Sequence, residues 1–314
     1  MRKQFIITLA LLLVLASCAD QTVTPSNQKS FLGGTIGLLV SFVEGEPPSE
    51  VTDGGATPFT VSVKLENKGE TFVDATDVTL TLKGIDAASF GVTNADLTMN
   101  PSEDLLDNDI NPDTGEAINS PPVYVTFSQL NYLGELSGNQ PFPFVVDVCY
   151  KYQTMATSQL CIKENLLDSS DTKVCTVTGS KNVQNSGAPV QILNFEEFSA
   201  GQNAVSFSFR VKNVGNGLLS AASSSCDQTP ANRDYVTVTV DSGLQGLTCS
   251  GLSNPSENGT AYSGDVKLAT GERQIRCTQQ LSDADQTDKI MIVDSSVDYD
   301  YQESTRTDVL VKHI

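Results

Sequence analysis

The amino-acid sequence predicts an all-β fold, and three observations support this prediction. Apolar and polar residues alternate with a period of two in stretches such as "FTVSVKLENKG" and "VSFSFRVKNVG", as they do in strands with one buried face. Clusters of turn-forming residues separate these stretches, in a chain that holds 23 Gly and 13 Pro. The third observation is that little of the sequence carries a helical periodicity.

The N-terminus predicts export. Arg2 and Lys3 precede a short apolar run, and Ala16 and Ser17 lead into Cys18, which is the layout of a secretory signal peptide. A helix of this length reaches only about half of the bilayer core, so we do not expect it to span a membrane. The order Leu-Ala-Ser-Cys resembles the lipobox of prokaryotic lipoproteins, which implies that Cys18 is lipidated and becomes the first residue of the mature chain. The alternative is an ordinary signal peptide with a cysteine near its cleavage site.

Net charge restricts the partners. The formal charge of the chain is −19, and removal of a signal peptide with two cations and no anions changes it to −21. Such a chain repels nucleic acid and anionic membrane surfaces, so we expect no nucleic-acid partner. The only membrane contact we expect is the N-terminal lipid.

Internal repeats predict the domain organisation. The stretch from Phe59 to Gly69 matches the stretch from Val205 to Gly215 at a displacement of 146 positions. Each stretch ends in Asn-x-Gly, which suits a turn after a strand. A second match joins "VTLTLKG" to "VTVTVDSG" further along the chain.

A third match lies near the end of each repeat. The run "YKYQ" followed by "LCIK" matches "YDYQ" followed by "VLVK" at a displacement of 149 positions. Each segment predicts a strand, a tight connection and a closing strand. Three matches in the same order indicate a duplicated domain.

We therefore predict two tandem immunoglobulin-like β-sandwich domains, because each repeat offers several short strands separated by turns. The signal peptide comprises residues 1–17, a tether residues 18–32, the first domain residues 33–163, a polar linker residues 164–186, and the second domain residues 187–314.

The run "PFTVSVKLENKGETFVDATDVTLTLKG" resembles the CARDB-type domains of prokaryotic surface proteins, which are named for a link to cell adhesion. In those domains a strand that ends in Asn-x-Gly is followed by a Val/Thr-rich strand. The order of "VDVCYKY", "CIK", "KVC" and "GAPV" is also similar to uncharacterised secreted archaeal proteins. The resemblance covers most of the mature chain. It implies a β-sandwich scaffold at the cell surface and does not imply a ligand.

Six cysteines remain besides Cys18, and in an exported protein we expect them to form disulfides. A zinc site is disfavoured, because the chain has no Cys-x-x-Cys spacing and a single histidine. The six are Cys149, Cys161, Cys175, Cys226, Cys249 and Cys277.

The pairing of these cysteines is left open by the sequence. Three belong with each domain, so either one bridge crosses between the domains or each domain keeps a free thiol. Cys149 and Cys161 point off the apolar face of strands expected to be hairpin partners, which allows a Cys149–Cys161 bridge, with Cys161–Cys175 as its rival. In the second domain Cys249–Cys277 is the favoured pair.

Catalysis is not predicted. The single histidine, His313, sits one residue from the C-terminus, a poor place for the positioned imidazole of Ser-His-Asp or Cys-His chemistry. No local pattern singles out a pair among the 38 acidic residues for glycoside hydrolysis, and tryptophan is absent. There is no phosphate-binding glycine loop and no dinucleotide fingerprint. We therefore expect neither an enzyme nor a cofactor.

One acidic stretch, "DNDINPDTGE", suggests a calcium loop, because oxygen-bearing side chains stand at alternate positions. The pattern then departs from the EF-hand: Pro112 stands where a glycine is needed, and Ile118 where a bidentate Glu is needed. The simpler interpretation is a solvated acidic loop. The candidate ligands are Asp107, Asp109, Asn111 and Asp113.

Two further features are expected at the surface. The aspartates of "VDYDY", which ends at Tyr301, alternate with tyrosines and should mark the solvated face of a strand. Asn258 begins the only usable glycosylation sequon, in a stretch that reads as a surface loop.

Two functional classes fit these predictions. The first is a lipid-anchored surface module that binds an unidentified protein or glycan, or acts as a spacer. The second is a structural subunit of a surface layer or filament, assembled by β-strand addition through an edge strand or the segment "FLGGTIGLLVSFV". Cys18 is the only attachment point that the sequence predicts, which favours the first class.

Overall fold

The computed structural model describes residues 30–168 and 174–314, and these residues form an all-β sandwich fold, as predicted. The predicted signal peptide (1–17) and the lipidation site Cys18 lie outside the described residues. Apart from strands, the described chain contains two short 3-10 helices, Ala75–Asp77 and Ala88–Phe90. No helix within these ranges is long and apolar enough to cross a membrane.

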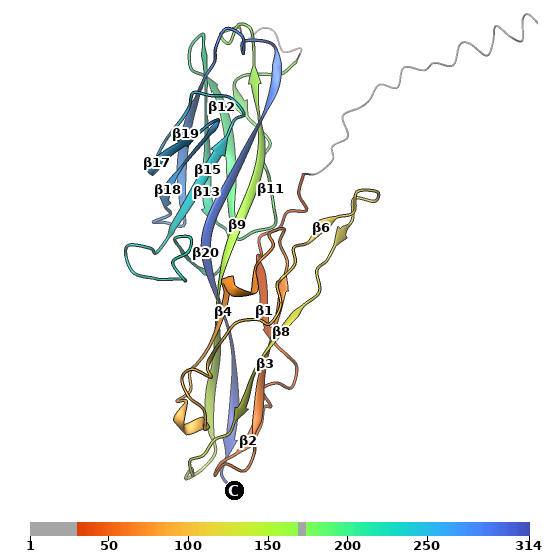
Figure 1. Ribbon diagram of the computed structural model, residues 1–314, viewed down its shortest axis with the longest axis vertical. Coiled ribbons are helices and arrows are strands. Elements are labelled where there is room, and N and C mark those ends of the chain that lie inside the picture. The colour runs from red at the N-terminus through yellow and green to blue at the C-terminus, as the bar shows by residue number, and fades with distance from the viewer. Residues whose placement is uncertain (1–29, 169–173) are drawn as a thin grey trace, which may run out of the picture.

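Two unusually long strands run the length of the elongated body (Figure 1). Strand β9 (Gln140–Ile162) and strand β20 (Lys289–Lys312) pair antiparallel along the whole of β9, with no shift of register. They form the centre of a ten-stranded sheet in the order β17-β18-β15-β20-β9-β4-β5, to which β2, β11 and β14 add.

Two smaller sheets cover this sheet (Figure 1). The three-stranded sheet β1-β3-β8 lies in the lower half of the figure, and the five-stranded sheet β10-β12-β13-β19-β16 lies in the upper half. The other strands are β1 (Leu38–Phe42), β2 (Glu50–Thr52), β3 (Phe59–Asn67), β4 (Val78–Lys83), β5 (Thr98–Met99), β6 (Asp109–Ile110), β7 (Ala117–Ile118), β8 (Val123–Leu130), β10 (Gly179–Ser180), β11 (Gln184–Asn185), β12 (Val190–Ser199), β13 (Ala204–Asn213), β14 (Leu218–Ser220), β15 (Tyr235–Asp241), β16 (Leu247–Ser250), β17 (Ser253–Asn258), β18 (Ala261–Lys267) and β19 (Glu272–Gln280).

The predicted hairpin at the end of each repeat is wrong, because each segment is one continuous strand. In β9 the residues after Gln153 keep the period of two, and their buried members Thr154, Ala156 and Ser158 are small. No Gly, Pro, Asn or Asp interrupts this stretch, so it lacks the strongest turn formers. Whether the chain divides into domains at 163 and 187 stays a prediction.

The two repeats are related by an approximate twofold axis through the β9–β20 ladder. Lys151 pairs with Asp300, and the repeat displacement of 149 carries Lys151 onto Asp300. Each long strand therefore starts in its own half of the body and ends in the other half. In the lower half, the last part of β20 pairs with β2, whose residue Val51 opposes Val311.

Four tyrosines fill the core where the long strands pass the axis. Tyr150 opposes Tyr301 and Tyr152 opposes Tyr299 in the ladder, and all four side chains are buried. Their rings contact one another, with centroids 5.9 Å apart for Tyr150 and Tyr301 and 6.3 Å apart for Tyr152 and Tyr299. The alternation of tyrosine with polar residues therefore predicts the buried face correctly.

The Asn-x-Gly sequences anchor this tyrosine cluster. Asn67 Oδ1 accepts hydrogen bonds from the Gly69 N–H (3.1 Å) and from the Tyr152 hydroxyl (3.1 Å). In the second repeat, Asn213 Oδ1 makes the equivalent bonds to Gly215 and to Tyr301, both at 3.2 Å. A Cβ on Gly69 would overlap the Tyr152 hydroxyl, which explains why the turn needs glycine. The matched segments thus make matched contacts.

The six cysteines form three disulfides. Cys249–Cys277 is confirmed, since the two residues face each other across β16 and β19. Of the two open pairings of Cys161, Cys161–Cys175 is present.

The Cys149–Cys161 alternative is wrong, because both residues lie on β9, twelve positions and about 40 Å apart. Cys149 instead bonds to Cys226 of the second repeat, so one bridge crosses between the repeats. Three disulfides indicate that the chain folds in an oxidising environment.

We predict that neither repeat folds alone, because each half of the body takes a strand segment from the other repeat. A fragment ending at Asp168 should give a poorly dispersed amide NMR spectrum, and so should a fragment beginning at Val174. Mixed under oxidising conditions, the two should recover the dispersed spectrum of the whole chain. A first fragment that gave a dispersed spectrum alone would contradict this and favour independent domains.

Candidate functional site

A polar groove of about 470 Å³ lies on the outer face of the ten-stranded sheet, beside the twofold axis. Its floor consists of outward-facing residues of β4, β9 and β20, among them Thr79, Thr81, Asp147 and Gln302. These positions alternate with buried residues of the core, so the strand period places them on this face.

One wall of the groove is the loop between β14 and β15, residues 221–234, which folds back over the sheet. The buried carboxylate of Asp300 holds this loop: it accepts hydrogen bonds from the Ser223 N–H (2.9 Å), the Ser224 hydroxyl (3.3 Å) and the Cys226 N–H (3.4 Å). The Cys149–Cys226 disulfide fastens the same loop to β9.

The backbone of this wall is in an uncommon conformation. Ser223, Ser225 and Cys226 have φ values of 61°, 55° and 57°, in the left-handed region that residues other than glycine seldom occupy. Such residues persist only where surrounding contacts determine them, and clusters of them are typical of functional sites. Asp300 and the disulfide supply those contacts here.

The groove offers hydroxyl groups and charges of both signs. Lys83 Nζ lies 2.6 Å from Asp147 Oδ2, and Lys151 Nζ lies 3.9 Å from Asp77 Oδ2. Both lysines and Asp77 are exposed, whereas Asp147 is half-buried, so the pairs contribute little to stability and the two lysines are available to a ligand. None of the described side chains that line the groove is aromatic. The arrangement suits a polar ligand that forms many hydrogen bonds.

The structure corrects one expectation about this region. The aspartates of "VDYDY" were expected on a solvated face, but Asp300 is only 3% exposed because the loop covers it. Asp298 is also partly buried, which raises the pKa of its carboxyl, and Gln153 Nε2 donates to it at 2.7 Å. A period of two places a residue on the outer face, but only the tertiary fold shows which outer positions a loop covers.

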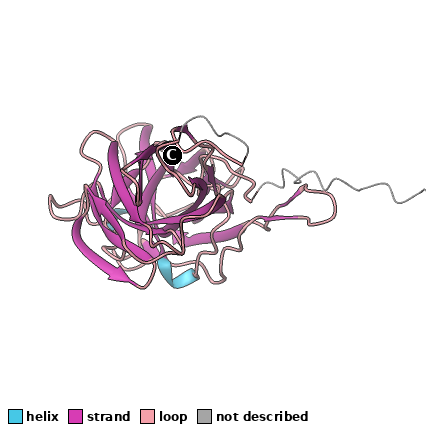
Figure 2. Cartoon of the chain, turned by 90° about the horizontal axis from the view of Figure 1, so that it is seen from above, coloured by secondary structure: helices cyan, strands magenta, loops and turns pink. Residues whose placement is uncertain are grey.

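The proposed calcium ligands do not converge. Asp109 lies on β6, which forms a hairpin with β7 that stands out from the body (Figure 2). Asn111 Oδ1 accepts hydrogen bonds from the N–H groups of Asp113 (2.9 Å) and Thr114 (3.2 Å), so it caps the turn of the hairpin. Across residues 30–168 and 174–314, no three His, Cys, Asp or Glu side chains are grouped to hold a metal ion.

His313 and Asn258 lie away from the groove. His313 Nδ1 lies 2.9 Å from Asp53 Oδ2, so the imidazole ties the chain end to the loop after β2. Hydrogen bonding lowers the pKa of Asp53, chiefly from the Leu136 N–H and then from His313. Asn258 is exposed at the end of β17, before the turn at Gly259, and its glycosylation stays a prediction.

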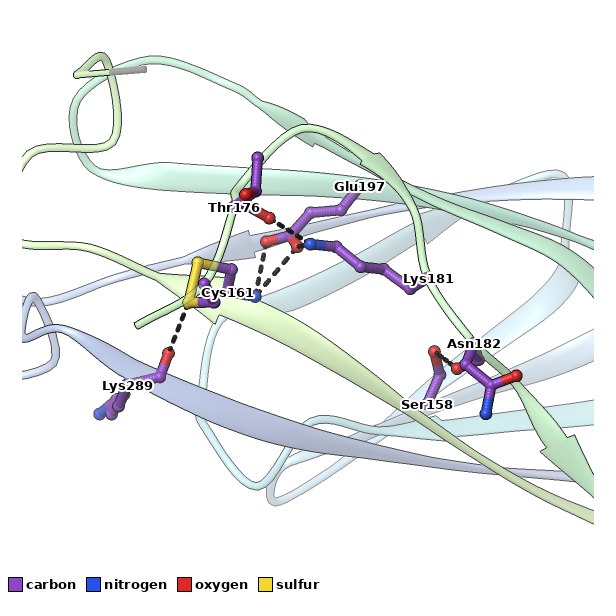
Figure 3. Close-up of polar contacts among 8 residues, drawn as sticks. Ser158, Cys161, Thr176, Lys181, Asn182, Glu197 and Lys289 are labelled. Atoms are coloured by element: carbon purple, nitrogen blue, oxygen red, sulfur yellow. Dashed lines mark hydrogen bonds and ion pairs between the residues drawn. A yellow bond between two sulfur atoms is a disulfide. The ribbon is translucent and has the colours of Figure 1, made fainter. Parts of the chain in front are cut away.

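A buried ion pair in the upper half was not predicted from the sequence (Figure 3). Glu197 of β12 is fully buried, and its two carboxylate oxygens accept the Cys161 N–H at 2.9 and 3.0 Å. Lys181 Nζ lies 2.9 Å from the same carboxylate and also donates to the Thr176 carbonyl. Glu197 therefore connects β9 to the linker segment beside the Cys161–Cys175 bridge.

Known proteins add little to this description. No family model matches the chain, and no curated protein matches it. The secreted serine protease VesC of Vibrio cholerae has a TM-score of 0.18 at 9% identity; the match covers 84% of this chain, which spans 50% of that chain. The collagen-binding domain of the Erysipelothrix rhusiopathiae surface protein RspB has a TM-score of 0.11 at 10% identity, over 91% of this chain and 90% of that chain. At such scores these likenesses carry no functional argument.

Glu197 predicts a pH dependence of stability. Burial raises its pKa to about 7, against the opposing effects of the Cys161 N–H and Lys181. The raised value means that the folded state favours the protonated form. The contribution of Glu197 to the free energy of unfolding is therefore fully present below the ordinary pKa of 4.5, and it is lost as the pH rises through 7.

Urea unfolding of the wild type and Glu197→Gln between pH 4.5 and 8 tests this prediction. Over that pH range the free energy of unfolding of the wild type should fall by on the order of 3 kcal/mol relative to that of the variant. Glu196→Gln, one position away and exposed, should follow the wild-type curve. Parallel curves for the wild type and Glu197→Gln would contradict the prediction.

Proposed function

We propose that this chain is a cell-surface binding protein without catalytic activity, held at the membrane by a lipid on Cys18. Its partner is a surface protein or a glycan that enters the polar groove. The resemblance of the run from Pro58 to Gly84 to CARDB-type domains supports this proposal. The three disulfides support it as well, since they suit a compartment outside the cytoplasm.

The observation that carries the proposal is that both sides of the groove are fixed. The floor belongs to the continuous β9–β20 ladder, and the wall is fastened by Asp300 and the Cys149–Cys226 bridge. A site that is already ordered loses little conformational entropy when it binds. The uncommon backbone of the wall is hard to explain as a connection alone, because a loop free of constraint would avoid it.

The chemistry of the groove indicates the class of ligand. Threonine hydroxyls on β4 can donate and accept hydrogen bonds, while Lys83 and Asp147 add one charge of each sign. A glycan or an extended peptide matches this pattern, because both present many donors and acceptors at short intervals. An apolar ligand would leave these groups without partners, at a cost in free energy.

The proposed anchor limits where the groove works. Cys18 precedes the first described residue, Ser30, by twelve positions, so a fully extended tether would span at most about 40 Å. A lipid on Cys18 would therefore hold the groove close to the cell surface, within reach of neighbouring proteins and glycans.

The filament subunit is the second candidate. An assembly by strand exchange would pass the segment around residues 31–43 to a neighbouring chain. In this structure Leu38–Phe42 forms β1 and pairs with β3 of the same chain, from Leu38–Asn67 to Phe42–Val63. This intramolecular pairing favours the binding protein.

A bulky side chain in the groove tests the proposal. The exported chain is applied to arrays of immobilised glycans and of purified surface proteins, and we expect one class of ligand to bind. Thr79→Tyr fills the groove while keeping a residue that favours strands, so binding should weaken about tenfold or more. Thr248→Tyr, exposed on β16 away from the groove, should bind as the wild type does. Equal binding by both variants would contradict the assignment of the groove.

The anchor is tested separately by Cys18→Ser. Wild-type protein from its native cells should occur in the membrane fraction, with an intact mass that equals a chain beginning at Cys18 plus lipid. Cys18→Ser should occur in the soluble fraction, because a single polar substitution removes the only lipid attachment that we propose. Ser26→Ala, in the same tether, should remain with the membrane. A lipid-free wild-type chain would refute the anchor and leave the groove assignment intact.

A further inference from the structure

Along part of its length, strand β20 has an edge that pairs with no strand of the described chain. On the side away from β9, β15 pairs with Asp294–Asp298, β14 with Asp300–Gln302 and β2 with Leu310–Lys312. Between Gln302 and Leu310, no backbone group of residues 30–168 or 174–314 pairs with this edge.

The unpaired backbone groups can be identified from the register. The Leu310 N–H donates to the Ser49 carbonyl (2.9 Å), so it points to the side away from β9. The β9–β20 ladder has no shift of register, and in a strand every second residue directs its N–H and C=O to the same side. The N–H and C=O groups of Ser304, Arg306 and Asp308 therefore point outward, as an added strand would require.

The twofold-related edge of β9 is covered by the chain itself. Ser186 meets Met155 there twice: the Ser186 N–H donates to the Met155 carbonyl (2.8 Å), and the Met155 N–H donates to Ser186 Oγ (2.9 Å). Next to this contact, Gln184 of β11 pairs with Thr157. The displacement of 149 carries Met155 and Thr157 onto Ser304 and Arg306, for which the described residues provide no such cover.

The segment that would cover β20 can be located by the same symmetry. The Lys68 N–H donates to the Gly37 carbonyl, and the Val214 N–H donates to the Pro189 carbonyl, both at 2.8 Å. Gly37 before β1 therefore corresponds to Pro189 before β12. Residues 32–34 lie as far before Gly37 as residues 184–186 lie before Pro189. They therefore correspond to the segment with β11 that covers the edge of β9.

Residues 32–34 are bound elsewhere. The N–H groups of Leu32 and Gly33 donate to the Glu70 carboxylate at 2.7 and 3.0 Å, and the Gly187 N–H donates to the same carboxylate at 2.7 Å. The Gly34 carbonyl accepts the Ala188 N–H (3.3 Å). These bonds hold the segment against the start of the second repeat, and the edge of β20 stays unpaired within the described chain.

A groove of about 480 Å³ lies beside the unpaired edge. Three apolar side chains that line it are unusually exposed: Ile36 at 43%, Leu39 at 38% and Leu218 at 53%. In strand addition the backbone of the incoming segment pairs with the edge, while alternate side chains enter pockets next to it. The three apolar residues supply such a pocket.

Glu303 adds a charge at the same place. Its counterpart in the first repeat, Thr154, is buried and bonds to the Val190 carbonyl (2.6 Å) and the Tyr299 hydroxyl (3.0 Å). Glu303 instead lines the groove, where its carboxylate accepts the Tyr150 hydroxyl at 3.4 Å. Partial burial raises the pKa of Glu303 to about 6, so at neutral pH the groove holds a poorly hydrated anion. A cationic side chain is its natural partner.

We propose that the edge of β20 from Ser304 to Asp308 binds an extended segment of a partner protein as an added strand, and that a Lys or Arg side chain of that segment pairs with Glu303. A basic segment also complements the formal charge of −19, which disfavours a second copy of this chain. The proposal goes beyond the polar groove, because it concerns the backbone edge of β20, which adjoins that groove at Gln302, and a different mode of recognition.

Synthetic peptides test the proposal on the full exported chain. The probes are peptides of ten residues that alternate Val and Thr and carry one Lys at each position in turn, with binding measured by fluorescence anisotropy. At least one peptide should bind. N-methylation of every second amide in one phase should abolish binding, whereas methylation in the other phase should not, because only one set of amides faces β20.

Two variants locate the binding. Glu303→Gln should bind the Lys peptide and its norleucine analogue equally, whereas the wild type should prefer Lys about tenfold. Arg306→Pro removes an outward N–H and leaves the ladder to β9 complete, so it should lose all peptide binding at an unchanged melting temperature. If Arg306→Pro fails to fold, Glu303→Gln and the methylation phases still decide the outcome.

Several results would overturn the proposal. One is the absence of binding by every peptide, and another is an equal effect of the two methylation phases. Concentration-dependent self-association that Arg306→Pro abolishes would make a second copy the occupant. Peptide binding that occurs only after deletion of residues 19–29 would make the chain's own tether the occupant. Thr79→Tyr should leave peptide binding unchanged, so failure here and failure of the polar groove are distinguishable.

Discussion

The antiparallel ladder between β9 and β20 is the constraint on which the rest of the structure depends. The two strands pair without a break for the whole of β9, and the ten-stranded sheet extends outward from them on both sides. Because each strand crosses from one half to the other, neither half has a complete sheet without residues from both repeats. The four tyrosines at the axis are buried and contact one another, so the core is continuous from one half to the other. In a tandem arrangement the same junction would be a hinge.

The cross-repeat disulfide depends on this exchange. Cys149 meets Cys226 because β9 passes under the loop that follows β14, and the same loop covers Asp300 of β20. The polar groove is therefore a product of the junction and belongs to neither repeat alone. Its position follows from the ladder, and its fixed wall follows from the buried carboxylate of Asp300 and the Cys149–Cys226 bridge.

The approximate symmetry is as informative where it fails as where it holds. The Asn-x-Gly turns and their tyrosine partners match closely in the two repeats. At the outer edges of the long strands they differ, because the linker covers β9 while residues 32–34 are bound to Glu70. Glu303, which corresponds to the buried Thr154 of the first repeat, lies at this asymmetric edge. The two repeats thus share their core contacts and differ at these outer edges.

The period of two in the sequence correctly predicts the strands, their buried faces and the burial of Tyr299 and Tyr301, since alternation is a local property of each strand. The Asn-x-Gly turns are predictable for the same reason. The partner of each strand is not, because pairing depends on segments far apart in the chain. The predicted hairpin, the Cys149–Cys161 bridge and the solvated Asp300 all failed at this point. The polar groove and the unpaired edge of β20 form only when β9 pairs with β20. These strands are far apart in the sequence, so no local pattern predicts their pairing.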